Sequence, residues 1–273
     1  MLIETHSLTK RFGNHIAVDQ LDIGIEAGEV FGLLGRNGAG KTIVIKMLTT
    51  LLEPTSGSAT IGGYDVVCDA AAVRRQIGYV PQTLSADGDL TGYENLAIFA
   101  KLYDIPYSEH KSRIGAALEM TDLTPFADKL VKSYSDGMIR RLEIAQSTLH
   151  RPRALFLDEP TVGLDPVARV AVWELLERLR AESGCAILLS THYLEEAEYS
   201  CRRVAIMERG VVAAIGNPNA LKAELGPQAT FSDVFAHYTH AGDVAVADDE
   251  IPETRLRRHI VDTSGWHYPE SAR

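Results

Sequence analysis

A glycine-rich loop with a lysine at its end constrains this sequence more than any other segment. The apolar run 30–34 leads into Gly35 to Thr42 (GRNGAGKT), and a helix is expected over 41–52. The loop fits the pattern G-x-x-x-x-G-K-[ST] in the strand–loop–helix context that gives the pattern meaning. Glycines let successive backbone N–H groups point into one concavity, and the helix N-terminus adds partial positive charge there. The segment predicts a phosphate-binding loop; the alternative is a glycine-rich turn with an incidental lysine.

The predicted loop assigns roles to individual residues. Lys41 is expected to reach the β- and γ-phosphates of a nucleotide, and Thr42 to ligate Mg²⁺. The residues expected to bind the nucleotide are Gly35, Asn37, Gly38, Ala39, Gly40, Lys41, Thr42 and Ile43.

Two adjacent acids follow the short apolar run 154–157. An ATPase needs one carboxylate for the hydration shell of Mg²⁺ and a second to polarise the attacking water. We therefore assign Asp158 to the metal and Glu159 to the general base. The alternative is that Asp-Glu-Pro only ends a strand and begins a turn. Combined with the phosphate loop, the catalytic interpretation is favoured.

A histidine follows the next buried run in the same way. Residues 186–189 are apolar, and Ser190, Thr191 and His192 come directly after them. Ligands of open α/β sheets bind outside the carboxyl ends of the strands. His192 is therefore expected to contact the γ-phosphate and help hold the attacking water, although a lone histidine is more often structural.

Apolar runs that alternate with helices predict the fold class. A mostly parallel α/β sheet covered on both faces is expected, with an antiparallel β subdomain and an inserted α-helical subdomain over about 93–150. Helix 167–182 is expected to present Val170, Trp173, Leu176 and Leu179 on one side, near helical spacing. The other expected elements are short strands in 2–31, strand pairs in 58–68 and 204–215, helices at 194–199 and 231–238, and helix breaks near Pro106, Pro125 and Ser133.

Composition excludes some classes of function. The formal net charge of -10 argues against nucleic-acid binding, which depends on clustered Lys and Arg. The three cysteines show no CxxC spacing, so neither a disulfide framework nor a zinc site is indicated. No apolar run approaches the roughly 20 residues that span a bilayer. If the protein works at a membrane, another chain is expected to anchor it.

At this point the residues resemble the ABC ATPase family over about 2–240. The family order is phosphate loop, glutamine loop, signature, Asp-Glu strand end, D-loop and switch histidine, and matching segments occur here in that order. The resemblance implies that Gln82 approaches Mg²⁺ and the water, that Asp165 belongs to the D-loop, and that Phe12 stacks on adenine. The segment 134–166 is similar to drug- and antibiotic-export ATPases of the daunorubicin-resistance type, as is 230–237. The domain assignment is an ATPase domain over 1–226 and a C-terminal extension over 227–273.

The signature departs from the family pattern. It reads Tyr-Ser-Asp-Gly-Met from residue 134 where this subgroup often has Tyr-Ser-Gly-Gly-Met. The resemblance implies that Ser135 and Gly137 contact the γ-phosphate held by the opposite subunit. Asp136 facing that nucleotide would cost roughly 1–4 kcal/mol at ~4 Å, whereas facing outward at a helix N-terminus it is favourable by about 0.3–1 kcal/mol. We favour the outward orientation. Ile43 stands where Thr or Ser is common, which weakens a hydrogen bond to the α-phosphate.

The resemblance also implies partners and a mechanism. Two ATPase subunits, identical or different, would sandwich two ATP molecules, and their closure and opening would drive a separate membrane permease. The subunit would lie peripherally on the cytoplasmic face of the cell membrane. The helical insertion and the Gln82 loop are the expected docking surface.

Three other interpretations stay open at this point. A regulatory or catalytically impaired subunit is motivated by Asp136, although Glu159 and His192 are retained. A non-transport ABC protein acting on DNA or ribosomes would carry a long coiled coil or a second cassette, and this sequence has neither. A GTPase of another P-loop family would carry Asn-Lys-x-Asp, which the sequence lacks.

Overall fold

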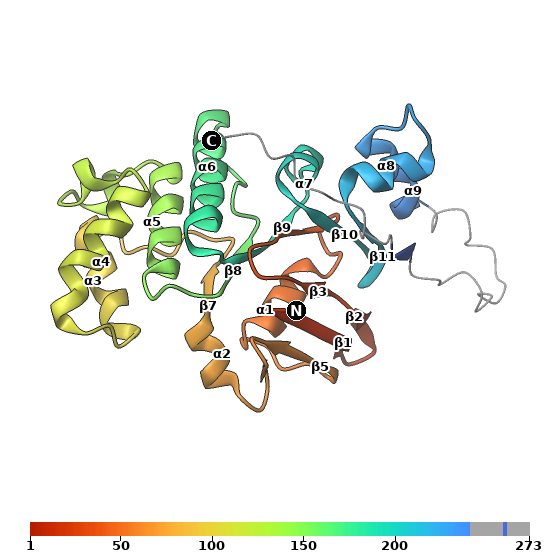
Figure 1. The fold of residues 1–273 in the computed structure, drawn as a ribbon, viewed down its shortest axis with the longest axis horizontal. Helices are drawn as coiled ribbons and strands as arrows, with labels where there is room; N and C mark the ends of the chain where they lie inside the picture. The colour runs from red at the N-terminus through yellow and green to blue at the C-terminus, as the bar shows by residue number, and fades with distance from the viewer. Residues whose placement is uncertain (241–258, 261–273) are drawn as a thin grey trace.

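The computed structural model describes residues 1–240 and 259–260 of this chain (Figure 1). The part of the predicted C-terminal extension beyond residue 240 falls outside the described residues, apart from 259–260. The strands are β1 (Ile3–Phe12), β2 (His15–Leu21), β3 (Gly24–Ile25), β4 (Val30–Leu34), β5 (Ser56–Ile61), β6 (Tyr64–Asp65), β7 (Ile77–Val80), β8 (Ala154–Asp158), β9 (Ala186–Thr191), β10 (Arg203–Glu208), β11 (Val211–Gly216) and β12 (His259–Ile260). The α-helices are α1 (Lys41–Leu48), α2 (Ala70–Gln76), α3 (Gly92–Leu102), α4 (Tyr107–Met120), α5 (Asp136–Thr148), α6 (Pro166–Ser183), α7 (Leu194–Ser200), α8 (Pro218–Leu225) and α9 (Phe231–His240).

Two sheets lie face to face in the middle of the molecule. The larger has the order β12-β11-β10-β4-β9-β8-β7, in which β10, β4, β9, β8 and β7 are parallel and β11 runs antiparallel to β10. The smaller sheet has the order β2-β1-β5-β6, with β3 paired to β1, and its strands are antiparallel. The predicted fold class, a mostly parallel core with an antiparallel β subdomain, is confirmed.

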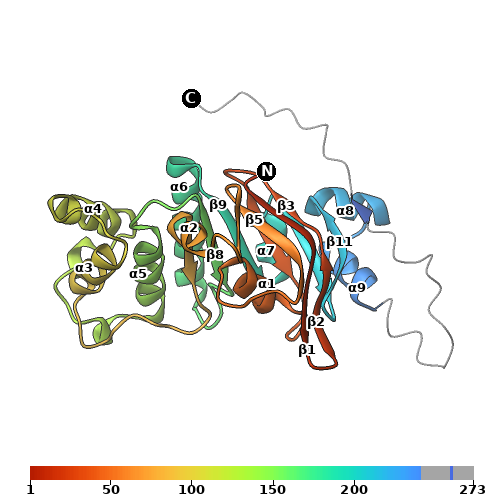
Figure 2. The same ribbon diagram turned by 90° about the horizontal axis from the view of Figure 1, so that it is seen from below.

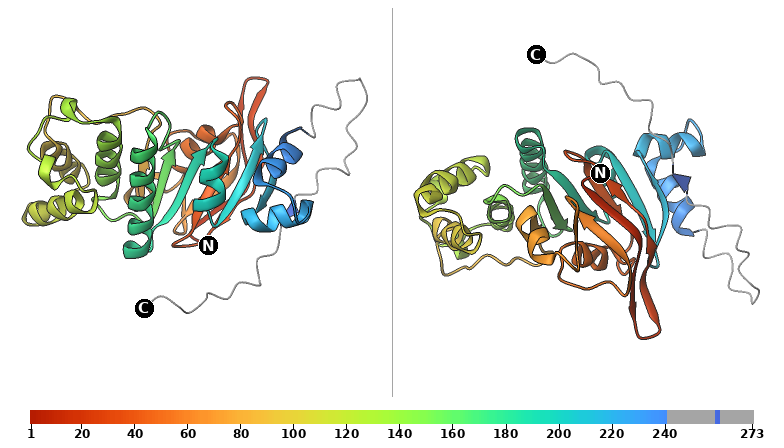
Figure 3. Two further views of the ribbon diagram at one scale, coloured as in Figure 1. Left: turned by 90° about the horizontal axis from the view of Figure 1, so that it is seen from above. Right: turned by 60° about the horizontal axis from the view of Figure 1, so that its bottom comes forward.

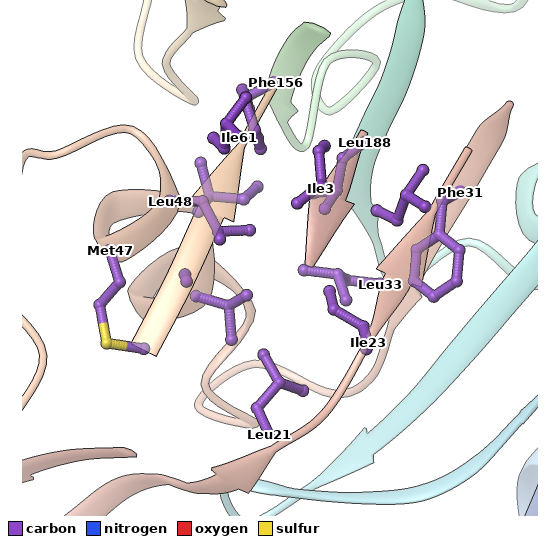
Figure 4. Packing of buried hydrophobic residues seen from close by; sticks show 14 of the residues in the cluster. Ile3, Leu21, Ile23, Phe31, Leu33, Met47, Leu48, Ile61, Phe156 and Leu188 are labelled. Atoms are coloured by element: carbon purple, nitrogen blue, oxygen red, sulfur yellow. The ribbon is translucent and has the colours of Figure 1, made fainter. Parts of the chain in front are cut away.

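The strands of the parallel sheet are buried on both faces, which explains why their central residues are apolar. In β4, Phe31 and Leu33 face α1 and the antiparallel sheet, whereas Val30 and Leu34 face the helices on the other side. Figure 4 shows the first of these layers, with the side chains of β4 and β9 meeting those of α1, β1 and β5. The alternation of side chains along a strand thus divides one apolar run between two cores.

The helical insertion forms a region with its own core. Helices α3, α4 and α5 gather at one end of the molecule, beyond β7 (Figures 1 and 2). They pack through a separate cluster that includes Leu96, Ile114 and Leu142. Helices α8 and α9 lie at the opposite end, beside β11 (Figure 3). Phe231 and Val234 of α9 are buried in the core on the α6 side of the sheet.

Several element boundaries differ from the sequence-based expectations. Helix α1 ends at Leu48 and not at 52, because Thr50 takes a left-handed conformation with φ of 62°. The strand pair expected over 58–68 is shorter, with β6 limited to two residues. Helices α2 and α8 and strand β7 were not predicted. Of the four residues predicted on the buried side of α6, Leu176 is buried and Trp173 and Leu179 pack against the core, whereas Val170 is 56% exposed. Val172 and Leu175, which were not predicted, complete the buried face.

Candidate nucleotide-hydrolysing site

The phosphate loop joins β4 to α1 at the carboxyl end of the parallel sheet. Gly40 is the N-cap of α1 with φ of 101°, and a Cβ there would lie 2.6 Å from the carbonyl oxygen of Ala17. Gly35 is equally confined, since a Cβ would lie 2.6 Å from the carbonyl oxygen of Met207. Arg36, Asn37 and Gly38 are exposed, so the open side of the loop faces solvent. The glycines are therefore required both by conformation and by close packing.

The N-terminus of helix α1 is suited to binding an anion. Its first turn carries no acidic residue, and no side chain caps its N-terminus. Such an end leaves backbone N–H groups and a partial positive charge directed at the loop. Ala39 is buried behind the loop, and Ile43 packs against the core, where its side chain offers no hydrogen bond.

A hydroxyl-and-carboxylate network lies below the loop. Thr42 Oγ1 donates to Asp158 Oδ1 at 3.1 Å, and Ser190 Oγ donates to the same oxygen at 2.6 Å. The backbone N–H of Glu159 donates to Ser190 Oγ at 2.9 Å, so one serine positions both acids. Burial of Tyr79 on β7 raises the pKa of its hydroxyl, and the charge of the buried Asp158 adds to that shift. Sequence reasoning missed Ser190, although it is a polar residue at the end of an apolar strand.

The Glu159 carboxylate is where the predicted catalytic motifs meet. Its Oε1 lies 3.3 Å from Lys41 Nζ and 3.3 Å from His192 Nδ1. Its Oε2 accepts a hydrogen bond from Gln82 Nε2 at 3.1 Å. The backbone at Glu159 has φ of 49°, a sparsely populated conformation for a residue with a side chain. The structure thus brings together Lys41, Gln82, Glu159 and His192, and their catalytic roles stay predictions.

Lys41 is a buried cation with several partners. Its Nζ donates to the carbonyl oxygens of Gly35 at 2.7 Å and Arg36 at 3.2 Å, in addition to its contact with Glu159. Buried charges are stable only when they are paired and hydrogen-bonded. The lysine therefore ties the phosphate loop to the Glu159 carboxylate.

The signature and D-loop residues lie outside this cluster and bond locally. Ser135 is the exposed N-cap of α5 and accepts from the Met138 N–H at 3.3 Å, and Asp136 beside it is exposed. Asp165 caps α6 by accepting from the N–H groups of Val167 and Ala168, both at 2.9 Å. The structure does not bring these residues to the Glu159 carboxylate.

Gly137 has a packing role that the sequence did not reveal. A Cβ at this position would lie 2.6 Å from the Cβ of Ala168, so only glycine lets α5 approach the start of α6 this closely. The signature glycine is thus needed within the chain, whatever it contacts outside it.

Phe12 lies apart from the carboxylates, at the end of β1. Its ring is 47% exposed, and Lys10 Nζ lies 5.2 Å from the ring centroid. An aromatic ring can stack on a base only with an exposed face. The exposure meets that condition, and the adenine-stacking role stays a prediction.

A second polar network supports the switch histidine. Glu196 is buried on α7 and accepts from Thr161 Oγ1 at 2.5 Å and Thr191 Oγ1 at 2.9 Å. Thr161 follows Asp158 and Glu159, and Thr191 precedes His192, so this carboxylate links the two loops. Sequence reasoning missed it, because the pairing joins residues of different elements.

A separate cavity of about 580 Å³ lies at the opposite end of the strands. Its lining includes Arg113, Arg151, Leu155 and Ile187, and none of the predicted site residues. The cluster around Glu159 is therefore distinct from this cavity.

Among residues 1–240 and 259–260, no helix combines the length and the hydropathy needed to cross a bilayer. In the same residues no three His, Cys, Asp or Glu side chains gather as a metal site.

The strand–loop–helix phosphate cradle, with paired acids at the end of β8 in the same sheet, defines a P-loop nucleoside triphosphatase. A sequence profile of the ABC transporter family matches residues 18–162, more than half of the chain. The chain is 43% identical over 224 residues to the daunorubicin/doxorubicin resistance ATP-binding protein DrrA of Streptomyces peucetius, covering 82% of this chain and 68% of the relative. It is 36% identical over 225 residues to the linearmycin resistance ATP-binding protein LnrL of Bacillus subtilis, covering 82% and 72%.

Solved structures agree with the sequence relatives. An ATP-binding subunit of an ABC transporter superposes with a TM-score of 0.78 at 30% identity, covering 87% of this chain and 99% of that one. A dimeric ATP-binding cassette in a post-hydrolysis state, bound to ADP and Pi, superposes with a TM-score of 0.70 at 25% identity, covering 79% and 98%. The chain belongs to the ABC transporter family. Within that family it is the ATP-binding subunit, an ATPase whose hydrolysis of ATP drives transport.

Proposed function

We propose that this chain hydrolyses ATP at the Glu159 cluster and thereby powers the export of a drug-like or antibiotic small molecule through a separate permease. The observation that carries the proposal is the convergence of Lys41, Gln82 and His192 on one buried carboxylate. Export is supported by the names of the resistance ATPases that the chain is similar to. The cargo contacts belong to the permease.

The triphosphate would bind against the loop amides and Lys41. The free N–H groups at the start of α1 and the lysine ammonium supply the positive charge. In the structure that ammonium lies 3.3 Å from Glu159. The γ-phosphate would compete with Glu159 for Lys41, and binding would thus release the carboxylate for its role as a base.

The donor set suits Mg²⁺. Thr42 Oγ1 and Asp158 Oδ1 lie 3.1 Å apart at the loop, and Gln82 adds an amide side chain at the same edge. Mg²⁺ prefers a few protein oxygens and keeps several waters. When bound, the ion would neutralise charge that develops on the β- and γ-phosphates.

The residues around Glu159 would carry the hydrolysis step. Glu159 accepts a proton from water while the water oxygen bonds to the γ-phosphorus. The bond from that phosphorus to the bridging oxygen breaks, giving ADP and phosphate. His192 and Gln82 hold the carboxylate and the water in line.

A second ATPase subunit would complete each site. Ser135 is exposed, and Val167 and Val170 on the first turns of α6 are exposed beside the D-loop residue Asp165. These residues form a surface that a partner subunit would cover, with Ser135 and Gly137 meeting its nucleotide. The solved dimeric cassette bound to ADP and Pi supports this arrangement.

The permease would dock on the helical region. Leu84 in the loop after Gln82, and Tyr93, Ile98 and Leu102 on α3, are large apolar side chains exposed to solvent. A group of this kind at one end of the molecule suits a protein partner. The subunit would then lie on the cytoplasmic face of the cell membrane, held there by the permease.

A catalytically impaired subunit is the second candidate, and exposed Asp136 in the signature favours it. The two proposals differ in turnover, which an active-site variant measures directly.

The test is phosphate release by the purified chain with Mg-ATP. Glu159→Gln is expected to lower kcat by about 100-fold or more, the scale of a lost general base, while fluorescent nucleotide still binds. Glu174→Gln on the exposed side of α6 is the matched control and should leave turnover unchanged. Equal rates in wild type and Glu159→Gln would refute the assignment. Purification from membranes without an integral membrane protein would contradict the permease.

A further inference from the structure

Arg140 is a charged side chain buried in the middle of the protein, one turn beyond the signature. It is 2% exposed, and its guanidinium leaves α5 to reach the loop that carries Gln82. Its Nη1 donates to the Pro81 carbonyl at 2.6 Å, and its Nη2 donates to the Gln82 carbonyl at 2.7 Å. The planar fork of one arginine therefore holds two consecutive carbonyls of the glutamine loop.

Glu143, one turn further along α5, holds the other end of the same loop. It is also buried, and it pairs with Arg140 Nη1 at 3.0 Å. Its Oε1 accepts from the hydroxyl of Ser85 at 3.0 Å and from the Ser85 backbone N–H. Residues 81–85 are thus fastened to α5 at both ends by one ion pair.

The energetics of this pair argue for positioning. Burying two charges carries a desolvation cost that their attraction often fails to recover, so an apolar pair of similar volume is frequently as stable. Burial lowers the pKa of Arg140, and the charges of Glu143 and Asp158 oppose that shift. Arg140 Nε also has no hydrogen-bond partner among the described residues. The pair lacks one hydrogen bond, yet Arg140 holds two carbonyls of the glutamine loop. We infer that the pair fixes the position of this loop at a cost in stability.

The loop 81–85, which Arg140 and Glu143 hold, also contacts Glu159 through the side chain of Gln82. Gln82 is held through its carbonyl by Arg140, and its side chain donates to Glu159 Oε2 at 3.1 Å. Ser135 and Gly137 lie at the start of the helix that carries Arg140, about 7.5 and about 4.5 Å from it along the axis at 1.5 Å per residue. A rigid helix and an ion pair therefore connect the signature to the base.

We propose that the Arg140–Glu143 pair is a positioning device that sets Gln82 against Glu159 and transmits displacement of the signature helix to that contact. The inference rests on the proposed roles of Gln82 and Glu159 in hydrolysis. Neither Arg140 nor Glu143 touches the reacting atoms; both act through Gln82.

A double-mutant cycle on turnover tests the proposal. Purified wild type, Arg140→Gln, Gln82→Ala and the double variant are compared for kcat, KM and fluorescent-nucleotide affinity. Arg140→Gln should lower kcat by about ten-fold, within the range of coupled neighbours, and leave nucleotide affinity within about two-fold. In the Gln82→Ala background the same change should alter kcat by less than about two-fold, because the contact through which it acts is gone.

Controls separate positioning from folding. Arg113→Gln removes an arginine of the helical region that bonds to Glu109 and to the Leu149 carbonyl, away from the glutamine loop. It should leave kcat unchanged. If Arg140→Gln does not fold, Glu143→Gln with Gln82→Ala provides the same cycle, because it weakens the grip on Ser85 while keeping an oxygen acceptor.

The outcomes distinguish this inference from the proposed function. Multiplicative effects of Arg140→Gln and Gln82→Ala would overturn the positioning role. So would parallel losses of affinity and kcat in Arg140→Gln. If Gln82→Ala or Glu159→Gln alone leaves kcat unchanged, the proposed catalytic roles fail first, and the positioning inference falls with them.

Discussion

At the carboxyl end of the sheet, Thr42 and Ser190 both donate to Asp158 below the phosphate loop, and Lys41 pairs with Glu159 beside them. At the start of α5, by contrast, Ser135 and Asp136 lie exposed, and Ser135 bonds to its own helix. The first region is prepared to hold a charged ligand in a buried setting. The second presents a short helix start to the outside, as expected for half of a site shared with another chain.

The two regions differ in where their polar groups find partners. Buried polar groups must be satisfied within the chain, so the phosphate-loop region is internally cross-linked. The exposed signature region is free to take an external partner. The four changes below probe that division, beginning with the largest expected effect.

Ser190→Ala changes the hydrogen-bonded region below the phosphate loop. It removes the hydroxyl that donates to Asp158 and accepts from the Glu159 N–H. A buried group left unsatisfied costs about 1–3 kcal/mol, so kcat should fall by roughly ten-fold or more through misplaced acids. Steady-state phosphate release is the measurement. Ser147→Ala, a buried serine that bonds within α5, is the control, and equal activities of the two variants would contradict the bridging role.

Gly137→Ala tests whether the signature also stabilises the fold of its own chain, in addition to presenting a surface to a partner. The added methyl would meet Ala168, and overpacking of this kind costs about 1–3 kcal/mol. The midpoint of thermal unfolding of the isolated chain should fall. Gly115→Ala on α4, where nothing lies within 4 Å, should instead stabilise by roughly 0.5–1 kcal/mol. An unchanged midpoint in Gly137→Ala would mean that this glycine serves only contacts outside the chain.

His150 tests the junction between the helical region and the sheet. It stacks on Tyr103 with centroids 3.7 Å apart and bonds to the Ile77 carbonyl at 3.0 Å. Burial, together with the nearby charge of Arg113, lowers the pKa of His150 to about 4. The unfolded chain therefore binds more protons between pH 6.5 and 4, and stability falls as the pH drops through that window.

His150→Gln should flatten that fall, because the group that titrates only on unfolding is removed. Denaturant unfolding between pH 7 and pH 5 provides the comparison of slopes. Identical slopes in the two proteins would exclude His150 as a source of the pH dependence.

Asp136→Asn is expected to have the smallest effect. With the carboxylate facing outward at the start of α5, its loss removes about 0.3–1 kcal/mol of helix-dipole stabilisation. Turnover should then change by less than about three-fold. A rise of ten-fold or more in kcat would mean that the carboxylate faces the nucleotide. That result would contradict the outward orientation and support a catalytically impaired wild-type site.

The sequence predicted those features that local patterns encode. The phosphate loop, the two strand-end acids and the helical insertion follow from glycine, charge and apolar runs of short range. The end of α1 did not follow, because it depends on a left-handed Thr50. The buried face of α6 was shifted, because packing against the sheet selected Val172 and Leu175 over Val170.

By itself the sequence determined the phosphate cradle and the family, because their residues lie within single short segments whose backbone requirements are local. Only the tertiary structure decided which side chains hold that cradle in place. Asp158 meets Thr42 across 116 positions, Arg140 meets the Gln82 carbonyl across 58, and Ser190 meets Asp158 across 32. Such partners are chosen by the order of strands and by the burial that makes each polar group need one, and neither is written in a local pattern.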